Sequence, residues 1–347
     1  MQIRNELTAV EWDATLQQLP NASRDVYFFP EYHTLHVANG DGKAYCAAIT
    51  EDENLLLISG LRSAIPSAGS EANSIVYYDI QTCNGYGGPL ATPGASRDFL
   101  ERAWAEWRRT SAEEGIVAAF FRLHPMINNE MWLPNDARVI PDRETVFVEL
   151  GQGLDAAWRS VGSSHRNMVS KGRRDSVQVV WNDPRGWQDF ESLYADAMGR
   201  LQASSSLLFS RNYFAALRSL PGVELATVRD GSELAAGAVF LVGPCWGHYH
   251  LSARRPDSAN YLTNCILQAA IERAAQSGLK GVHLGGGRTR SPDDGLFKFK
   301  RGIGTVALDF KVALVVSDNA SYAKLCRDRS NSLGRTPTWL LGYRESA

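Results

Sequence analysis

One order of predicted elements occurs twice in this 347-residue chain and limits the folds that it can adopt. Residues 44–121 predict three strands, a glycine-rich or polar loop, a helix and a fourth strand. Residues 223–284 predict the same succession with few identical residues, so the repeat is one of element order. Two such units indicate an α/β (α+β) protein, a duplicated fold in which helices flank mixed central sheets.

The length of the chain also favours two domains, because 347 residues exceed the usual size of one. Apolar residues make up 44% of the chain and aromatic residues 10%, which is enough for two ordinary cores. The segment Gly151-Gln152-Gly153 interrupts the pattern between the two repeats. We therefore expect a first domain over residues 1–150 and a second over residues 151–347.

Charge and cysteine usage exclude several classes of protein. The formal net charge of −2 gives no overall attraction to DNA. The five cysteines lie far apart and form no CxxC pair, which argues against a disulfide framework or a zinc site. The first residues lack the apolar core of a signal peptide, and no run reaches the roughly 20 apolar residues of a transmembrane helix. We expect a cytoplasmic protein with no transmembrane segment, no DNA partner and no metal.

The stretch 246–304 holds the strongest candidate site. It predicts a strand (246–251), a polar loop (252–257), a helix (258–278) and a strand (281–284), followed by the glycines 285–287. Glycines at the end of a strand allow a substrate to approach the backbone closely. Five cations then follow within residues 288–301, and Lys300 is the one that we place near a reacting carbonyl, where it would stabilise an oxyanion. The alternative is that Phe297 and Phe299 belong to a core and the lysines face solvent.

Three further features carry weaker signals. Tyr86 lies in the glycine-rich loop 84–89 and could form a floor for a flat substrate, although the loop could equally be only a tight turn. His248 and His250 share one face of a strand, but partly buried sheet histidines are commoner than metal ligands there. The segment 154–174 predicts one helix that is rich in arginine and includes Arg166 and Lys171.

Seven segments spread over most of the chain together carry a family resemblance through their order and spacing. They are residues 27–33, 85–89, 163–172, 249–253, 259–262, 283–287 and 296–300. With these segments the chain resembles the FemAB/FemX-like aminoacyltransferases and the related "acetyltransferase 6" group of bacterial envelope-polysaccharide clusters. The repeated element order likewise resembles the central part of the acetyltransferase (GNAT) fold.

The resemblance implies two tandem GNAT-like domains, with the transfer site chiefly in the second and the first an acceptor-binding or structural half. In FemX-like members a Phe-Lys pair lines the transfer site, and Phe299 and Lys300 fall on that pair. We predict these two as the catalytic residues. The predicted substrate-binding residues are Tyr86, Arg166, Lys171, Tyr249, His250, Asn260, Gly285, Gly286, Gly287 and Arg288. Of these, Arg166 and Lys171 would hold a phosphate of a nucleotide-linked acceptor.

The resemblance also implies the reaction. Family members transfer an amino acid from aminoacyl-tRNA, or an acyl group from another activated donor, to an amine of an envelope precursor. We expect no permanently bound cofactor, with aminoacyl-tRNA or acyl-CoA as co-substrate. The acyl-CoA signature [QR]xxGx[GA], which cradles a pyrophosphate at a helix N-terminus, has no good match before either long helix. The long charged coiled-coil arm of some family members is also missing, as it is in FemX-like members.

We therefore predict a transferase that forms an amide on an amine of a cell-envelope glycan or peptidoglycan-type precursor. The acceptor would be a small molecule or a lipid- or nucleotide-linked sugar, and tRNA is a candidate partner. The alternative from another class is a non-catalytic module on the same fold that binds sugar nucleotides or glycans. A third hypothesis is a tRNA-binding accessory protein, whose binding would weaken steeply with salt.

Overall fold

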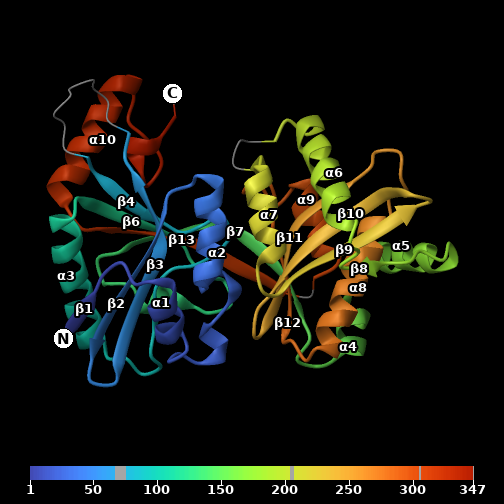
Figure 1. Ribbon diagram of the computed structural model, residues 1–347, viewed down its shortest axis with the longest axis horizontal. Coiled ribbons are helices and arrows are strands. Elements are labelled where there is room, and N and C mark those ends of the chain that lie inside the picture. The colour runs from blue at the N-terminus through green and yellow to red at the C-terminus, as the bar shows by residue number, and fades with distance from the viewer. Residues whose placement is uncertain (67–75, 204–206, 305, 347) are drawn as a thin grey trace. The chain divides into compact units, whose positions relative to one another are not determined.

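The computed structural model describes residues 1–66, 76–203, 207–304 and 306–346, and the chain forms two compact units (Figure 1). The first unit comprises Met1–Asp142 and Phe310–Ala347, and the second comprises Arg143–Asp309. This division differs from the predicted one at residue 150, because the last 38 residues belong to the first unit and not to the second. In the described part of the chain, no helix has the length and apolar character that crossing a bilayer requires.

The first unit is built on a mixed sheet with the strand order β1-β2-β3-β4-β6-β13, to which β5 adds by pairing with β3. Its core joins the sheet to α1 and α3 and includes the fully buried side chains of Trp12, Trp104 and Trp107. The strands are β1 (Gln2–Arg4), β2 (Lys43–Glu51), β3 (Asn54–Ala64), β4 (Tyr78–Gln81), β5 (Leu90–Ala91), β6 (Ile116–Arg122) and β13 (Val306–Val316). The helices are α1 (Ala9–Leu16), α2 (Pro30–Asn39), α3 (Arg97–Glu113) and α10 (Asn319–Leu333), with 3-10 turns at Asn21–Ser23, Val26–Phe28, Asn129–Trp132 and Gly342–Arg344.

Local sequence explains where these helices begin and which face they bury. Thr8 and Glu11 form a reciprocal capping box at the start of α1, which satisfies two backbone N–H groups of the first turn. Ser96 caps α3 by accepting the N–H of Phe99. Along α3, apolar side chains recur at helical spacing and face the sheet, while arginines and glutamates occupy the solvent side.

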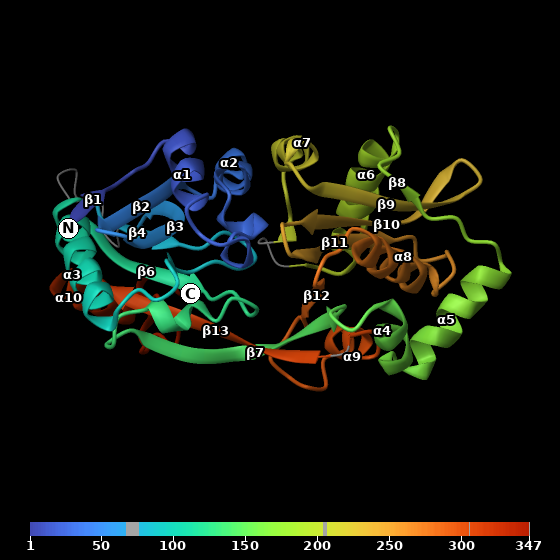
Figure 2. The ribbon, with the colours of Figure 1, turned by 90° about the horizontal axis from the view of Figure 1, so that it is seen from below.

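The second unit has a sheet with the strand order β7-β12-β11-β10-β9-β8. Figure 2 shows α6 and α7 on one face of its strands and α8 and α9 on the other. The strands are β7 (Arg138–Glu149), β8 (Val180–Trp181), β9 (Val223–Asp230), β10 (Glu233–Val242), β11 (Trp246–Arg254) and β12 (Gly281–Gly286). The helices are α4 (Leu154–Ser160), α5 (Ser163–Arg174), α6 (Gly186–Arg200), α7 (Arg211–Ser219), α8 (Leu262–Gln276) and α9 (Gly295–Arg301). Because helices cover both faces, β10 is buried along almost its whole length.

The predicted repeat of element order is confirmed, and the structure shows that the strand directions repeat as well. In the first unit β2, β3 and β4 pair antiparallel and β4 pairs parallel with β6. In the second unit β9, β10 and β11 pair antiparallel and β11 pairs parallel with β12. The last strand of each sheet is exchanged: β7 follows β6 in the chain but pairs with β12, and β13 follows β12 but pairs with β6. This exchange explains why the C-terminal residues return to the first unit.

Two local predictions, the helix over 154–174 and the loop from residue 252, were wrong. The helix predicted over 154–174 is two helices, α4 and α5, because Val161 and Gly162 have extended backbone angles between them. Gly162 also approaches Gly302 so closely that a Cβ would lie 3.0 Å from the carbonyl oxygen of Gly302. The loop predicted from residue 252 begins later, since β11 continues through Arg254. The charged segment around Lys300, which fits either a strand edge or a helical turn, is helical and forms α9.

Candidate active site in the second unit

The two parallel strands of the second unit separate part-way along their length. The last Cα pair between β11 and β12 joins His248 to His283. Beyond this point β11 continues to Arg254 and β12 to Gly286 without further pairing to each other. The β10–β11 register also shifts here, so that His250 is an extra residue between Tyr249 and Leu251. Such a bulge bends the strand and re-aims its side chains.

The equivalent strands of the first unit stay together. After β4 ends, the Thr82 N–H donates to the Phe120 carbonyl oxygen at 3.1 Å, and the Gly87 N–H donates to the Arg122 carbonyl oxygen at 2.7 Å. The Thr82 hydroxyl oxygen accepts the N–H of Arg122 at 2.9 Å. These bonds hold the loop that follows β4 against β6, in the place where the second unit has separated strands.

Lys300 of α9 lies between the separated strands. Its side chain is buried, and its Nζ donates to the carbonyl oxygen of Gly286 at 2.8 Å, at the end of β12. The same Nζ lies 5.8 Å from the ring centroid of Tyr249 on β11, within cation–π range. Lys300 therefore contacts both strands, and the structure brings together three of the predicted site residues.

Burial sets the protonation chemistry of this cluster. It lowers the pKa of Lys300 from 10.5 to about 8, although the carboxylate of Asp294 partly offsets the shift. Burial also raises the pKa of Tyr249 to about 12, while a hydrogen bond from its hydroxyl to Ser252 acts in the opposite direction. An ammonium group has three N–H donors, so Lys300 can bond Gly286 and still offer donors to a substrate oxygen. At neutral pH, Lys300 is a cation in a low-dielectric site.

Asp294 fixes the loop that carries the glycines. Its Oδ1 caps α9 by accepting the N–H groups of Leu296 and Phe297, at 2.9 and 3.0 Å. Its Oδ2 accepts the N–H groups of Arg288 and Thr289, at 3.1 and 3.0 Å. These hydrogen bonds lower the pKa of Asp294 to about 2. Asp294 is missing from the predicted site residues, although an Asp directly before a helix is a recognisable N-cap signal.

The glycine run has a packing role in this structure. Gly285 has a φ of +74°, in the left-handed region that favours glycine. A Cβ on Gly287 would lie 2.5 Å from Oδ1 of Asp294 and 3.0 Å from the Cβ of Phe297. Gly286 supplies the carbonyl that accepts from Lys300. Gly287 therefore allows the chain directly after β12 to pack tightly against the start of α9, and Gly285 allows the left-handed backbone before it.

Removal of the Asp294 side chain tests whether its hydrogen bonds fix the loop before α9. Asp294→Ala is expected to lower the free energy of unfolding by about 1 kcal/mol, the usual cost of a lost N-cap. The amides of Arg288, Thr289 and Leu296 should exchange faster with deuterium, which mass spectrometry or NMR can measure. The matched control is Asp293→Ala, because Asp293 is exposed and pairs with Lys298 at the surface. Equal effects of the two substitutions would contradict the role given to Asp294.

The other predicted residues of the second unit lie around this cluster in different ways. Phe299 is partly buried and packs against the same apolar core as Tyr249, whereas Phe297 is a core residue. The Nε2 of His250 lies 2.7 Å from the hydroxyl of Tyr213 on α7. Asn260 and Arg288 are exposed.

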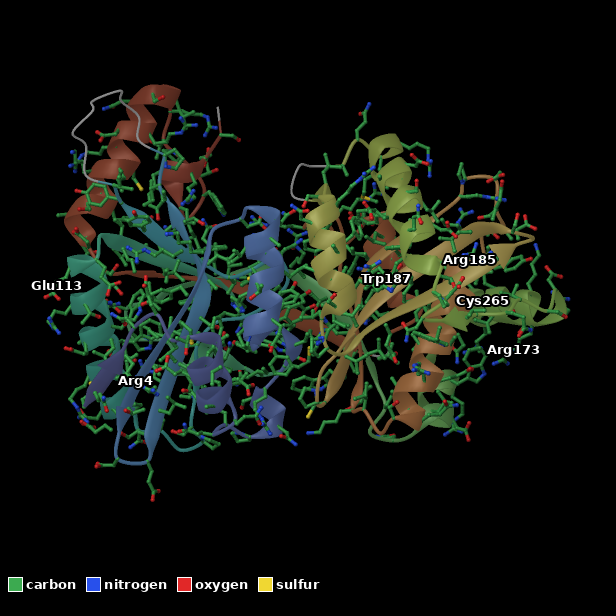
Figure 3. The ribbon with its side chains drawn as sticks, viewed as in Figure 1. Arg4, Glu113, Arg173, Arg185, Trp187 and Cys265 are labelled. Carbon is green, nitrogen blue, oxygen red and sulfur yellow. The ribbon has the colours of Figure 1, made fainter. Side chains whose placement is uncertain are left out.

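The predicted phosphate contacts lie on α5, which packs against α8 where a Cβ on Gly172 would lie 2.2 Å from Sγ of Cys265. Cys265 is labelled in Figure 3. Arg166 donates to the backbone carbonyl oxygens of Val161 and Arg159, so its guanidinium closes the end of α4. Lys171 is exposed, and its Nζ lies 5.1 Å from the ring centroid of Tyr261. Of the two, Lys171 is the more accessible to a ligand.

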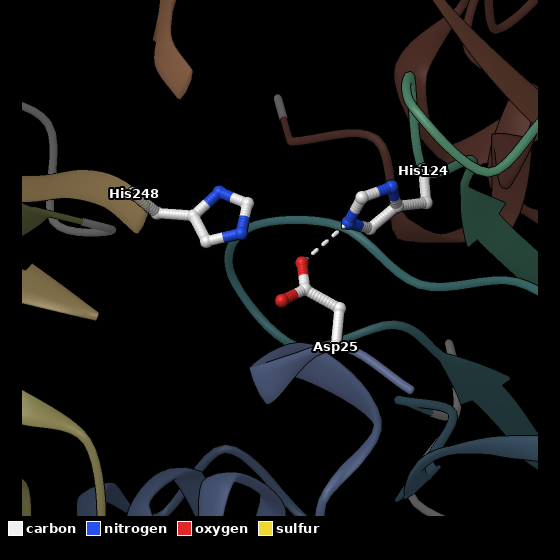
Figure 4. Close-up of side chains that lie close together, drawn as sticks. All are labelled: Asp25, His124 and His248. Carbon is white, nitrogen blue, oxygen red and sulfur yellow. Dashed lines mark hydrogen bonds and ion pairs between the residues drawn. The ribbon is translucent and has the colours of Figure 1, made fainter. Parts of the chain in front are cut away.

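Tyr86 belongs to the first unit. Its ring packs edge-on against Tyr27 and Phe310 and lies 6.0 Å from the ring of His124. The Nδ1 of His124 accepts the N–H of Met126, so the proton lies on Nε2, which donates to Asp25 at 2.6 Å (Figure 4). Both side chains of this pair are buried. Tyr86 stays a predicted substrate contact, and its half-buried ring rests on this polar core.

Comparisons with known proteins agree with this architecture. Residues 163–301, which include α5, α8, α9 and Lys300, match the family described as acetyltransferase (GNAT) domain. The crystal structure of FemX superposes with a TM-score of 0.65 at 13% identity, covering 90% of this chain and 97% of FemX. The chain has a FemX-like fold of two tandem GNAT-like domains. This result confirms the predicted resemblance and fold class.

Two further structures share the fold at similarly low identity. One is the C-terminal domain of a putative lysylphosphatidylglycerol synthetase from Agrobacterium fabrum, with a TM-score of 0.56, 14% identity and coverage of 96% of this chain and 99% of that one. The other is L-PGS from Bacillus licheniformis, with a TM-score of 0.52, 11% identity and coverage of 88% and 91%. No curated protein matches the chain in sequence. At these identities the structural comparisons show a shared fold and nothing about activity.

Proposed function

We propose that this protein is an N-acyl or aminoacyl transferase. It moves an acyl or aminoacyl group from an activated donor, aminoacyl-tRNA or acyl-CoA, to an amine of a cell-envelope glycan or peptidoglycan-type precursor. The observation that supports this most directly is the position of Lys300, a buried cation that contacts both separated strands of the GNAT-matched segment.

In this mechanism the acceptor amine attacks the carbonyl carbon of the donor, and a C–N bond forms as the carbonyl oxygen takes negative charge. Lys300 donates a hydrogen bond to this oxyanion. The tetrahedral intermediate then collapses: the C–O bond to the tRNA ribose, or the C–S bond to CoA, breaks and the leaving group takes up a proton. The amine loses its proton to water or to a substrate group. Holding the two reactants together supplies a further part of the acceleration.

The contrast between the units supports a transfer site in the second one. In the first unit the loop that follows β4 is hydrogen-bonded to β6, whereas the equivalent strands of the second unit separate. We therefore assign the first unit an acceptor-binding or structural role. Within the second unit, Phe299 would pack against donor or acceptor and Lys171 would contact an acceptor phosphate.

The test is an amide-forming assay with a pH profile. Purified protein is incubated with aminoacyl-tRNA or acyl-CoA and amino-sugar or peptide amines, and mass spectrometry detects the amide. The rate should fall above about pH 8, because the pKa of Lys300 is lowered to about 8. The neutral Lys300 side chain lacks the positive charge that stabilises the oxyanion. In Lys300→Arg, whose side chain stays charged, this fall should disappear. Tight binding of a sugar nucleotide with no amide from any donor would favour the non-catalytic alternative.

A further inference from the structure

The second unit has a groove between α6 and α7 that plays no part in the proposed reaction. Its volume is about 650 Å³, within the roughly 300–1,000 Å³ range of small-molecule sites. Its lining includes Tyr194 and Met198 of α6 and Phe214 of α7, all nearly buried, and excludes Lys300. Figure 2 shows α6 and α7 on the face of the sheet opposite to α9. We call this the α6–α7 groove.

Aromatic side chains make up much of the lining of this groove. Tyr194, Phe209 and Phe214 all line it, with the ring of Tyr194 5.7 Å from that of Phe214 and 6.3 Å from that of Phe209. Leu208 adds an apolar rim that is 54% exposed. Exposed apolar surface beside a recess lined by aromatic rings favours a ligand with an apolar or aromatic body.

Contacts within the protein hold the aromatic wall in place. Phe209 stacks on Tyr213 with a centroid distance of 4.0 Å and an interplanar angle of 15°. The hydroxyl of Tyr213 in turn lies 2.7 Å from the Nε2 of His250, the bulged residue of β11. A wall held in this way loses little side-chain entropy on binding, which is the advantage of a preorganised site.

Two charged side chains line this groove. They are Glu191 and Arg211, and Oε1 of Glu191 lies 3.8 Å from Nε of Arg211. The side chain of Arg211 is 96% exposed, and such surface pairs contribute little. An ammonium group can therefore replace Arg211 as the partner of Glu191, and the negative faces of the aromatic rings favour the same charge.

From these contacts we propose that the α6–α7 groove is a binding site for a small molecule with an apolar, preferably aromatic, body and an ammonium group. It is separate from the transfer site, and its occupancy does not depend on the proposed function. Glu191 pairs with the ammonium group, and Tyr194, Phe209 and Phe214 contact the body.

The chain offers a substitution that fills the groove without disturbing the fold. Gly199 lines the groove from α6, and a Cβ built there meets no atom within 4 Å. Gly199→Phe should therefore fold normally and occupy the space of the ligand. Gly151→Phe is the matched control, because Gly151 also has open space around its Cβ but lies outside the groove. Glu191→Gln keeps the shape of the groove and removes its carboxylate.

The experiment is a ligand-observed NMR titration of the full-length protein with 2-phenylethylamine, 2-phenylethanol and 3-phenylpropanoate. We expect the amine to bind in the millimolar range or more tightly, in keeping with its few atoms. Gly199→Phe should abolish its binding, Gly151→Phe should leave it unchanged, and Glu191→Gln should weaken it about fivefold. Equal affinity for the amine and the carboxylate, or retained binding in Gly199→Phe, would overturn the proposal, as would no binding to the wild-type protein.

Discussion

Replacement of Lys300 by methionine is expected to lower the rate of amide formation about 100- to 1,000-fold, the usual cost of removing one oxyanion donor. The affinity for the acceptor should not change, because the ammonium group acts on the carbonyl oxygen of the donor. Single-turnover rates and acceptor titrations of the wild type and the variant separate these two quantities. An unchanged rate would remove Lys300 from the chemistry.

The same substitution should not destabilise the fold, and this distinguishes a catalytic lysine from a structural one. Burial lowers the pKa of Lys300 from 10.5 to about 8, and a fall of this size corresponds to about 3 kcal/mol against the charged form at neutral pH. Methionine has a similar length and no charge, although it leaves the carbonyl of Gly286 without this donor. We expect the free energy of unfolding of Lys300→Met at pH 7 to equal or exceed that of the wild type.

The pH dependence of stability gives an independent check. The folded-state pKa of Lys300 lies below its unfolded value, so the unfolded chain binds more protons between about pH 8 and 10.5. The cost of the buried charge is therefore present below pH 8 and is relieved as the pH rises through that window. Urea unfolding of the wild type should show this relative gain at pH 10, and Lys300→Met should lack it. Loss of stability at pH 7 in the variant would mark Lys300 as structural.

The fold was accessible from the sequence because its signals are local. Apolar runs bounded by turns mark β2, β3, β9 and β10, and their order repeats. The exchange of β7 and β13 left no such signal, since it depends on which sheet a strand joins, and pairing partners are not encoded by the strand itself. The predicted boundary at residue 150 therefore differs from the compact units.

The sequence indicates which residues form the candidate site, but not the contacts that hold them in place. The glycines 285–287 and Lys300 were recognised as a group, and the structure joins Gly286 to Lys300. The sequence could not show that Gly287 accommodates Asp294 and Phe297, because this depends on close packing between Gly287 and a helix that starts eight residues later. Nor could it show that the guanidinium of Arg166 donates its hydrogen bonds to backbone carbonyl oxygens at the end of α4. Such contacts are set by geometry at the ends of helices.

The largest effect on stability is expected from Arg344, in the C-terminal segment of the first unit. Its guanidinium donates to both carboxylate oxygens of Asp79, at 2.5 and 2.8 Å, and to the carbonyl oxygens of Ser63 and Ala64. The side chain of Asp79 is fully buried. Arg344→Met would leave a buried carboxylate without its cation, which typically costs about 3–5 kcal/mol. Denaturant unfolding monitored by tryptophan fluorescence measures the loss.

Two further variants decide whether the ion pair causes this loss. Arg335→Met is the matched control, because the Arg335 side chain that pairs with Glu345 is half exposed, so the change should cost about 1 kcal/mol or less. Asp79→Leu combined with Arg344→Met removes both charges and should recover much of the stability, since a buried ion pair is worth little more than well-packed apolar residues. If Arg344→Met cost no more than Arg335→Met, the buried pair would not hold the C-terminal segment. If the double variant were no more stable than Arg344→Met, the loss would arise from the packing of the arginine stem and not from the orphaned charge.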